Sequence, residues 1–510
     1  MPSPTRHDRR RFLQGLGALA ATGAASALFP QLELVGRALA AAPVPGDYRA
    51  LVCIFLFGGN DSYNMLIPHV QTEYDRYLTS RGGVYNADSN PFGLGIARDS
   101  LSVITDTSSK KWGLHPAFAA AKPLFDSGEL AFLANVGSLS EPIYHVSEID
   151  SLAKSVPPYL YSHNDQQAQW MRGHATETHK GNGWGGLSAD HVAALNTGLQ
   201  TLPPTISIFG NNLYQNGLSV LPYAIDASGP SELARMTSTG SSADAIRLDA
   251  LNAILQSGNS PVMQARYAGL GDGSMEINGV LRNALDPANG GDITTVFPGS
   301  FLGAQLRMIA RMIKVSQTAA IGHKRQIYFA GLGGFDTHDL QMDPTRHAAL
   351  LTQIAEALAA FRQGLQEVGQ LNNVTTFTMS DFGRTLNSNG NGTDHAWGGV
   401  QMIMGGAAAN GGSLMGRKVW GSYPVLELDG DMTTGRGRMI PTTSIQQYGA
   451  TFASWLGVGD NDLGTIFPGL DLFPTSRLGF LAEAGSAVAV DPVTQLVRGV
   501  RRGIGVTVAQ

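Results

Sequence analysis

Short apolar runs that end in glycine or polar residues alternate with longer amphipathic stretches along much of this chain. Five runs are bounded by turn residues and rich in β-branched or aromatic side chains, which predicts buried strands at 51–57, 130–136, 205–209, 326–330 and 374–379. Apolar positions recur at helical spacing in other stretches, which predicts helices at 117–125, 301–317, 345–365 and after Ser444. This alternation of strands and helices predicts an α/β fold.

The segment from about 196 to 300 interrupts the alternation. It is rich in Gly, Ser, Asn and Thr and carries few clusters of acids or histidines. We therefore expect a lid or inserted subdomain at this place. Length alone gives about three domains for a chain of 510 residues, but α/β alternation on both sides of the segment predicts one domain over 43–510.

The N-terminal residues have the features of a targeting segment. Arg9-Arg10-Arg11-Phe12-Leu13 opens an Ala/Gly-rich run over 15–30, and small residues follow at 38–42. This pattern resembles a twin-arginine signal, so we expect residues 1–42 to direct export through the twin-arginine machinery to the periplasm or beyond. The run contains three glycines and falls short of the roughly 18 apolar residues of a membrane-spanning helix, so we expect no such segment in the mature chain.

Charge and cysteine content limit the kinds of partner that the chain can bind and the kinds of bond that can stabilise it. Removing the leader takes away five Arg and two acids and changes the formal net charge from -5 to -8. No basic stripe with interleaved aromatic residues remains, so we expect no nucleic-acid partner. Cys53 is the single cysteine, which excludes an internal disulfide, and its apolar neighbours predict a core position.

Acids and histidines follow two of the predicted strands. Asp61 comes after Gly58-Gly59-Asn60, while Asp336 and His338 come after Gly333-Gly334-Phe335. Ligands of open α/β sheets bind at the carboxyl ends of strands, so these side chains are candidates for one site. Asp336 and His338 stand two apart, on the same side of an extended loop, and could chelate one ion. Asp61 is either a ligand or the closing residue of an Asx-turn.

A third strand end adds Asp381 and Arg384, and the loop after it adds Asp394 and His395. Arg384 offers a planar, bidentate donor for a phosphate or sulfate group, with an Asp–Arg ion pair as the alternative. His395 lies among glycines without apolar periodicity, which favours a metal ligand. Asp394 is either a ligand or a residue that orients an imidazole.

Carboxylates combined with imidazoles form a mixed oxygen and nitrogen set. Such a set suits one or two divalent ions such as Zn²⁺ or Mn²⁺ better than Ca²⁺. Ser162 stands at a predicted helix start, where it serves either as a nucleophile favoured by the helix dipole or as an N-cap. The chain has neither a Gly-x-Ser-x-Gly elbow nor a phosphate loop, which argues against an ordinary serine hydrolase or a nucleoside-triphosphate enzyme.

A set of motifs distributed over the whole mature chain carries a family resemblance. The motifs are Phe57-Gly58-Gly59-Asn60-Asp61, Leu114-His115-Pro116, Tyr161-Ser162-His163 with Gln167 and Trp170, Gly183-Trp184, Gly333-Gly334-Phe335-Asp336-Thr337-His338, Ser380-Asp381-Phe382-Gly383-Arg384-Thr385, Gly392-Thr393-Asp394-His395 and Pro441-Thr442-Thr443-Ser444. In this order and spacing they resemble the bacterial secreted family called domain of unknown function 1501.

That family is in turn similar to the alkaline phosphatase and sulfatase superfamily. The resemblance implies a mixed, mainly parallel central sheet flanked by helices, with Ser162 as nucleophile and metal ligands at Asp61, Asp336, His338, Asp381 and His395. It implies a metal-dependent hydrolase of phosphate or sulfate esters, with Arg384 stabilising the charged oxygens and a small-molecule or polysaccharide ester as substrate. The alternative is a non-catalytic periplasmic or envelope-associated binding protein that keeps the fold.

Overall fold

The computed structural model describes residues 48–176, 181–231, 242–255 and 262–482. The predicted signal at 1–42 lies outside these residues. Within them, none of the helices combines the length and the apolar character needed to cross a membrane.

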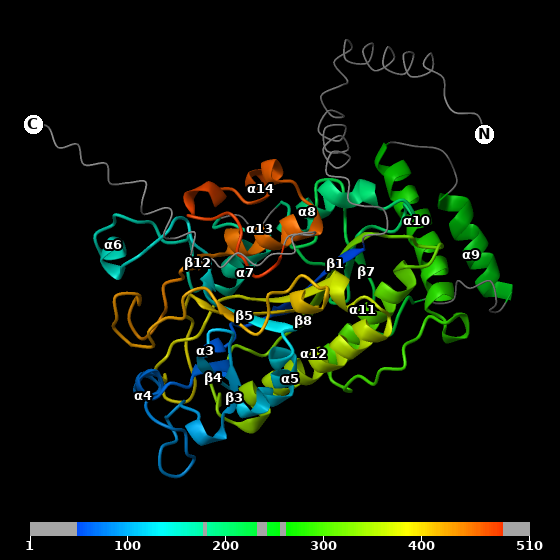
Figure 1. The fold of residues 1–510 in the computed structure, drawn as a ribbon. Coiled ribbons are helices and arrows are strands. Elements are labelled where there is room, and N and C mark those ends of the chain that lie inside the picture. Colours follow the sequence, from blue (N-terminus) through cyan, green and yellow to red (C-terminus); the bar gives the residue numbers. More distant parts are fainter. Residues whose placement is uncertain (1–47, 177–180, 232–241, 256–261, 483–510) are drawn as a thin grey trace, which may run out of the picture.

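A central sheet of nine strands forms the middle layer of the molecule (Figure 1). Strand β1 (Arg49–Leu56) lies between β8 (Arg325–Leu332) and β9 (Val374–Ser380) and pairs with both in parallel. The other strands of this sheet are β5 (Leu130–Gly137), β6 (Thr205–Ser207), β7 (Tyr223–Ala224), β10 (Gly399–Gly405), β11 (Val419–Trp420) and β12 (Thr443–Ser444).

The sheet is mixed because of one strand. β10 runs antiparallel to both β9 and β5, whereas β6, β7, β8, β11 and β12 make parallel pairs. The predicted mixed, mainly parallel sheet flanked by helices is therefore confirmed. A separate antiparallel sheet contains β2 (Leu66–Pro68), β4 (Lys111–Leu114) and β3 (Ser102–Thr105).

Helices cover both faces of the central sheet (Figure 1). The α-helices of the described residues are α3 (Ser62–Met65), α4 (Gln71–Ser80), α5 (Lys122–Asp126), α6 (Val146–Asp150), α7 (His163–Arg172), α8 (Trp184–Val192), α9 (Ser242–Leu255), α10 (Val262–Leu285), α11 (Phe301–Ser316), α12 (Ala349–Glu367), α13 (Ile445–Leu456) and α14 (Asp460–Ile466).

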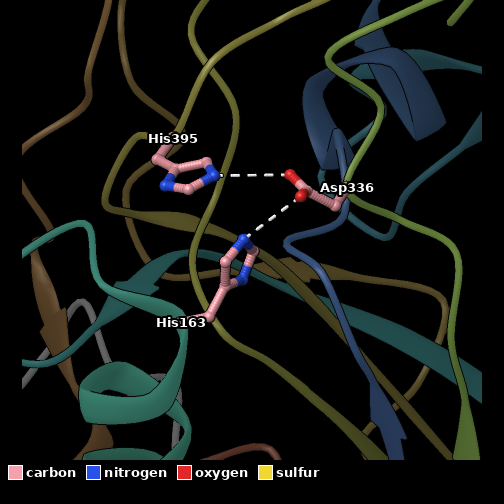
Figure 2. A group of neighbouring side chains, drawn as sticks. All are labelled: His163, Asp336 and His395. Atoms are coloured by element: carbon pink, nitrogen blue, oxygen red, sulfur yellow. Dashed lines mark ion pairs between the residues drawn. The ribbon is translucent and has the colours of Figure 1, made fainter.

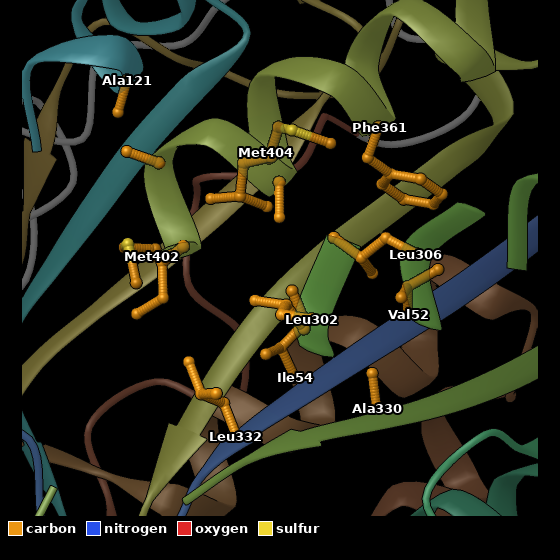
Figure 3. Close-up of a cluster of buried hydrophobic side chains, with 14 of the residues drawn as sticks. Val52, Ile54, Ala121, Leu302, Leu306, Ala330, Leu332, Phe361, Met402 and Met404 are labelled. Atoms are coloured by element: carbon orange, nitrogen blue, oxygen red, sulfur yellow. The ribbon is translucent and has the colours of Figure 1, made fainter. Parts of the chain in front are cut away.

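Alternate residues of β1 face two different cores, as the period of a strand requires. Val52 and Ile54 pack with Leu302, Leu306 and Phe361 of α11 and α12 (Figure 3). Leu51, Cys53 and Phe55 pack on the opposite face with residues of α7, α8, α13 and α14. Cys53 is fully buried, as its sequence context predicted.

Two predicted elements differ in detail from the observed ones. The helix expected at 117–125 is a 3₁₀ helix (Pro116–Ala121) continued by the short α5, with Pro123 close to the junction. The segment at 196–300 is not wholly separate from the sheet, because β6 pairs in parallel with β8. The same segment contributes α9 and α10, helices that the Gly/Ser-rich sequence did not predict.

Candidate metal centre

The carboxyl ends of β8, β1 and β9 meet at one edge of the sheet and bring their loops together. Close approach at this edge requires a glycine. Gly58 has φ +113°, and a Cβ atom at this position would lie 2.4 Å from the backbone nitrogen of Asp336. Glycine alone adopts this conformation readily and leaves the β8 loop room to lie against the end of β1.

His163, Asp336 and His395 form the group of side chains best arranged to bind a cation (Figure 2). One ligand atom from each lies within 4.8 Å of the other two. Nε2 of His163 is 3.4 Å from Oδ2 of Asp336, and Nε2 of His395 is 3.3 Å from Oδ1. The Asp336 side chain is 44% exposed, so the group faces solvent on one side.

The first residue of α7 contributes His163 to this group. Its Nδ1 lies 2.6 Å from Oδ2 of Asp381, which is fully buried. Oδ2 also accepts a hydrogen bond from Gln167, and Oδ1 accepts one from the backbone N–H of Gly58. Asp381, predicted as a metal ligand, therefore uses both oxygens on protein donors and orients the imidazole of His163.

The hydrogen bonds of the two histidines indicate which ring nitrogen carries the proton. Nδ1 of His395 lies 2.8 Å from the carbonyl oxygen of Tyr161. Because a carbonyl oxygen can only accept, Nδ1 of His395 is the donor, and the lone pair of the neutral ring lies on Nε2. The carboxylate of Asp381 has the same effect on His163. Both Nε2 atoms thus present lone pairs toward Asp336.

His338 adds a third imidazole at the margin of the group. Its Nδ1 lies 3.0 Å from Oδ1 of Asp394, and its Nε2 lies 3.1 Å from Oδ1 of Asp336. Nε2 of His338 is also 2.8 Å from Nε2 of His395. Two neutral lone pairs at this distance repel each other, so the contact is favourable only with a proton or a cation between the rings.

Charges around the group shift several pKa values. The hydrogen bond to Asp381 raises the pKa of His163 against the opposing effect of burial. Burial lowers the pKa of His395. Burial alone would raise the pKa of Asp336, but the hydrogen bond and charge of Arg384 outweigh it and lower that pKa. The ring nitrogens and the carboxylate consequently differ in their readiness to give up a proton.

Asp394 orients His338 rather than joining the central group. Burial would raise the pKa of Asp394, but hydrogen bonds from Asn389, Arg436 and His338 outweigh it and lower the pKa to about 2. Oδ2 accepts from Arg436 at 2.5 Å, while Oδ1 faces His338. Of the two roles predicted from the sequence, the geometry favours orientation of an imidazole.

Asp61 lies apart from the central group. Its side chain is fully buried, and Oδ1 accepts from Arg81 at 2.6 Å while Oδ2 accepts from Gln341 at 2.6 Å. Both oxygens are therefore engaged by protein donors. The expectation that Asp61 is a metal ligand does not fit this arrangement, because the fully buried carboxylate is neutralised by Arg81 and lies outside the group of donor atoms that could share one ion.

Arg384 also differs from its predicted role. Its side chain is fully buried, and Nη1 binds Oδ1 of Asp336 at 2.7 Å. The remaining contacts of the guanidinium join Oγ1 and the carbonyl oxygen of Thr393 and the carbonyl oxygen of Gly58. The ion-pair alternative is therefore the one that the structure contains, and Arg384 holds Asp336 instead of facing an incoming oxyanion.

Ser162 occupies the N-cap position of α7, next to His163, as the sequence predicted. Its side chain makes no capping hydrogen bond to the helix backbone. The hydroxyl instead donates to a carboxylate oxygen of Asp165, one turn into α7. A hydroxyl that is not used for capping and has a carboxylate acceptor is suited to nucleophilic chemistry.

His163 is the functional candidate that the sequence analysis did not assign. It stands directly after Ser162 in the motif Tyr161-Ser162-His163, of which the sequence analysis assigned a chemical role only to the serine. The acceptor that orients its ring, Asp381, is 218 positions away, so no local pattern connects the two residues. Phe382, which follows Asp381, packs its ring against His163 and His395 with centroid distances of 4.9 and 4.6 Å.

The residues of the group fit a divalent metal ion. Nε2 of His163 is buried and has no hydrogen-bond partner within the described part of the chain. Leaving such an atom unsatisfied is costly, and a cation would satisfy it. Two imidazoles and one carboxylate match the three protein ligands of many catalytic zinc sites.

Two crystal structures are among the solved structures with partial similarity to this chain. The crystal structure of Ps i-CgsB in complex with k-i-k-neocarrahexaose has a TM-score of 0.32 and 10% identity and covers 82% of this chain and 74% of its own. The crystal structure of PsFucS1 sulfatase from Pseudoalteromonas sp. has a TM-score of 0.28 and 10% identity and covers 90% and 75%. Similarity at this level carries no argument about the chemistry of this chain.

Among curated proteins the chain has no match. A family model described as "Protein of unknown function (DUF1501)" matches residues 48–427, which include β1, α7 and all the residues of the centre. The chain therefore belongs to the DUF1501 family.

Proposed function

We propose that this chain is an exported hydrolase of phosphate or sulfate esters that uses a divalent metal ion. The observation that carries the proposal is the shared orientation of His163 and His395. Each ring is fixed through Nδ1 by a protein acceptor, and each directs Nε2 at the half-exposed carboxylate of Asp336. Pre-oriented donors of this kind are typical of metal centres.

His163, Asp336 and His395 would hold the ion, with His338 beside them. The donor set suits Zn²⁺ or Mn²⁺. When bound, the ion would withdraw charge from a phosphoryl or sulfuryl oxygen. Arg384 and Asp381 keep the carboxylate of Asp336 and the ring of His163 in place.

Ser162 is the proposed nucleophile. Its Oγ forms the new bond to the phosphorus or sulfur of the ester, and the bond to the leaving alkoxide breaks. The hydroxyl proton passes to Asp165, whose carboxylate already accepts the hydrogen bond of this hydroxyl. The N-terminus of α7, a helix of ten residues, favours negative charge near Ser162. The leaving alkoxide takes a proton from water, and the resulting hydroxide attacks the phosphorus or sulfur. The bond to Oγ of Ser162 then breaks, and Asp165 returns its proton to Oγ, which restores the enzyme.

The test uses protein purified after native export. We expect about one Zn²⁺ or Mn²⁺ per chain by elemental analysis, and hydrolysis of p-nitrophenyl phosphate or p-nitrophenyl sulfate that is lost with a chelator and regained with the metal. Ser162→Ala should lower turnover by about 1000-fold or more without removing the metal, because the covalent route would be closed. Ser151→Ala, at an exposed serine, is the control and should match wild type.

Absence of bound metal from the wild-type protein would refute the proposal. A metal-loaded wild type that hydrolyses neither ester would favour the second candidate, a non-catalytic binding protein with one structural ion. The engagement of Asp61 by Arg81 and Gln341 favours that second candidate, because it removes a carboxylate that a two-metal hydrolase would use.

A further inference from the structure

A row of buried polar side chains connects the Asp61–Arg81 ion pair with Asp336. Its members are Asp61, Gln341, Thr393 and Arg384, and each side chain is almost completely inaccessible to solvent, at 1% exposure or less. Buried polar groups of this kind are costly unless every one of them is satisfied. The row therefore has one arrangement that is strongly preferred over others.

Gln341 is the junction of the row. Its Nε2 donates to Oδ2 of Asp61 at 2.6 Å. Its Oε1 accepts from Oγ1 of Thr337 at 2.9 Å and from Oγ1 of Thr393 at 2.5 Å. A primary amide supplies a donor and an acceptor at the same distance from the backbone, which neither a carboxylate nor an aliphatic side chain does.

The two threonines bound by Gln341 belong to the two loops that carry metal-ligand candidates. Thr337 lies between Asp336 and His338, and Thr393 lies two residues before His395. The Gln341 side chain thus joins both loops, beside the backbone hydrogen bonds from Thr393 N–H to the carbonyl oxygen of Thr337 at 3.0 Å and from Gln341 N–H to the carbonyl oxygen of Asn391 at 3.2 Å. The hydroxyl of Thr393 also accepts from Nε of Arg384 at 3.1 Å, and Arg384 in turn binds Oδ1 of Asp336 at 2.7 Å.

We infer that Gln341 is a positioning residue for the metal centre, whose side chain adds to the backbone contacts between the two loops and fixes Thr337 and Thr393, and with them Asp336 and His395, in one relative placement. The inference rests on the proposed function, because it assigns to Gln341 a role in metal affinity. Gln341 does not contact the central group itself. It acts through the loops and through Arg384, as the partners of metal ligands do in other metal centres.

The test measures Co²⁺ binding to the full mature chain through affinity and through the visible absorption of the bound ion. Gln341→Met keeps the approximate volume and removes both kinds of hydrogen bond. We expect it to weaken Co²⁺ binding by about 10- to 100-fold, the range for partners of metal ligands, and to change the absorption band. If Gln341→Met fails to fold, Thr393→Val breaks the same row and should weaken Co²⁺ binding by about tenfold.

The matched control is Gln401→Met. Gln401 is also a buried glutamine that accepts from a threonine hydroxyl, at 2.9 Å from Thr378, but both residues lie within β10 and β9 and outside the two loops. We expect its Co²⁺ affinity to stay within about twofold of wild type. Equal loss in the two variants would overturn the inference, because general destabilisation would then explain both.

Wild-type Co²⁺ affinity and spectrum in Gln341→Met would overturn this inference and leave the proposed function intact. A wild-type chain that binds no Co²⁺, Zn²⁺ or Mn²⁺ would instead overturn the proposed function, and the inference with it. The two failures are therefore distinguishable from the wild-type titration alone.

Discussion

The ends of β1 and β8 share the pattern Gly-Gly-x-Asp, but their acids lie in opposite environments. Gly58-Gly59-Asn60-Asp61 follows β1, and Gly333-Gly334-Phe335-Asp336 follows β8. The strands are parallel neighbours with Leu56 paired to Leu332. Yet Asp61 is fully buried in an ion pair with Arg81, whereas the side chain of Asp336 is 44% exposed and faces the imidazoles.

Two differences separate the two ends. Asp61 stands five residues after Leu56, while Asp336 stands four residues after the paired Leu332, so the β1 loop is one residue longer. The residue before the acid also differs, since Asn60 bonds to His347 and Phe335 packs into the hydrophobic core. Identical glycines and acids therefore support either a structural ion pair or a candidate ligand, depending on the side chains that surround them.

The largest expected effect comes from removing the charge of Asp61, the buried acid. Asp61→Asn leaves the buried guanidinium of Arg81 without its countercharge, which should lower the free energy of unfolding by about 3–5 kcal/mol. Urea unfolding at pH 7 in the presence of a chelator measures the loss. Glu73→Gln removes the acid of the part-exposed pair with Lys110 and should cost about 1 kcal/mol or less. Equal losses in Asp61→Asn and Glu73→Gln would show that the Asp61–Arg81 pair contributes no more to stability than a part-exposed ion pair.

A second prediction concerns the loss of stability at acidic pH that is caused by His347, a buried histidine near the end of β1. Burial lowers the pKa of His347 to about 4. Between pH 6.5 and 4 the unfolded chain binds a proton that the folded chain does not, so stability is complete above about pH 6.5 and falls as the pH decreases. At about 1.4 kcal/mol for each pKa unit, the lowered pKa of His347 reduces the free energy of unfolding by about 3 kcal/mol as the pH falls from 6.5 to 4.

His347→Gln should remove this share of the pH dependence. Urea unfolding at pH 7.5 and pH 4.5 measures it, with His145→Gln at an exposed histidine as the control. An unchanged slope in His347→Gln would contradict the assignment. Some dependence should remain, because burial also lowers the pKa of His115, to about 3.

The third prediction concerns Asp336, the part-exposed acid. Asp336→Asn removes the charged oxygen at the middle of the central group and should weaken Zn²⁺ or Co²⁺ binding by more than about 100-fold, above the range for partners of ligands. Calorimetric titration measures the affinity. Asp150→Asn, at an exposed acid of α6, should bind like wild type. Retained affinity in Asp336→Asn would exclude this residue as a ligand.

The smallest expected effect sharpens the distinction between a ligand and the residue that orients it. Asp394→Asn keeps an oxygen for Nδ1 of His338 but loses the charge, and should weaken Co²⁺ binding by about tenfold. Asp471→Asn, at a distant exposed acid, serves as the control in the same titration. A loss as large as that of Asp336→Asn would make Asp394 a ligand.

Much of the fold could be predicted because its strands are buried on both faces. The runs at 51–57, 130–136 and 374–379 match β1, β5 and β9 closely, since a strand covered on both sides reads as a continuous apolar segment. β10 was not predicted, although Val400-Gln401-Met402-Ile403-Met404 is largely apolar. The Gly/Asn-rich loop before it and the short helical and turn segments after it obscured this strand.

The site could be predicted only in part. A strand end identified Asp336 and a Gly-rich loop identified His395 as candidates, and the local sequence placed Ser162 at a helix start, where the structure also has it. Asp61 and Arg384 have the sequence signals of a metal ligand and of an anion-binding residue, yet Asp61 is engaged in a fully buried ion pair and the buried guanidinium of Arg384 binds the part-exposed Asp336. Arg81, the partner of Asp61, lies at the end of α4, and Asp336, the partner of Arg384, lies in the loop after β8. No local sequence pattern indicates either pairing.

The sequence by itself determined most of the longer strands and helices, though not β10, α9 or α10, and which acids and histidines follow strands, because periodicity and glycine position are local properties. Tertiary structure decided which of those side chains meet. Arg81 neutralises Asp61, Asp381 directs the ring of His163, and the carbonyl of Tyr161 fixes His395. Hydrogen bonds between residues far apart in sequence select one role for each acid, since Asp61 is fully enclosed with Arg81 whereas Asp336, although bound by Arg384, keeps one side open to solvent and the imidazoles.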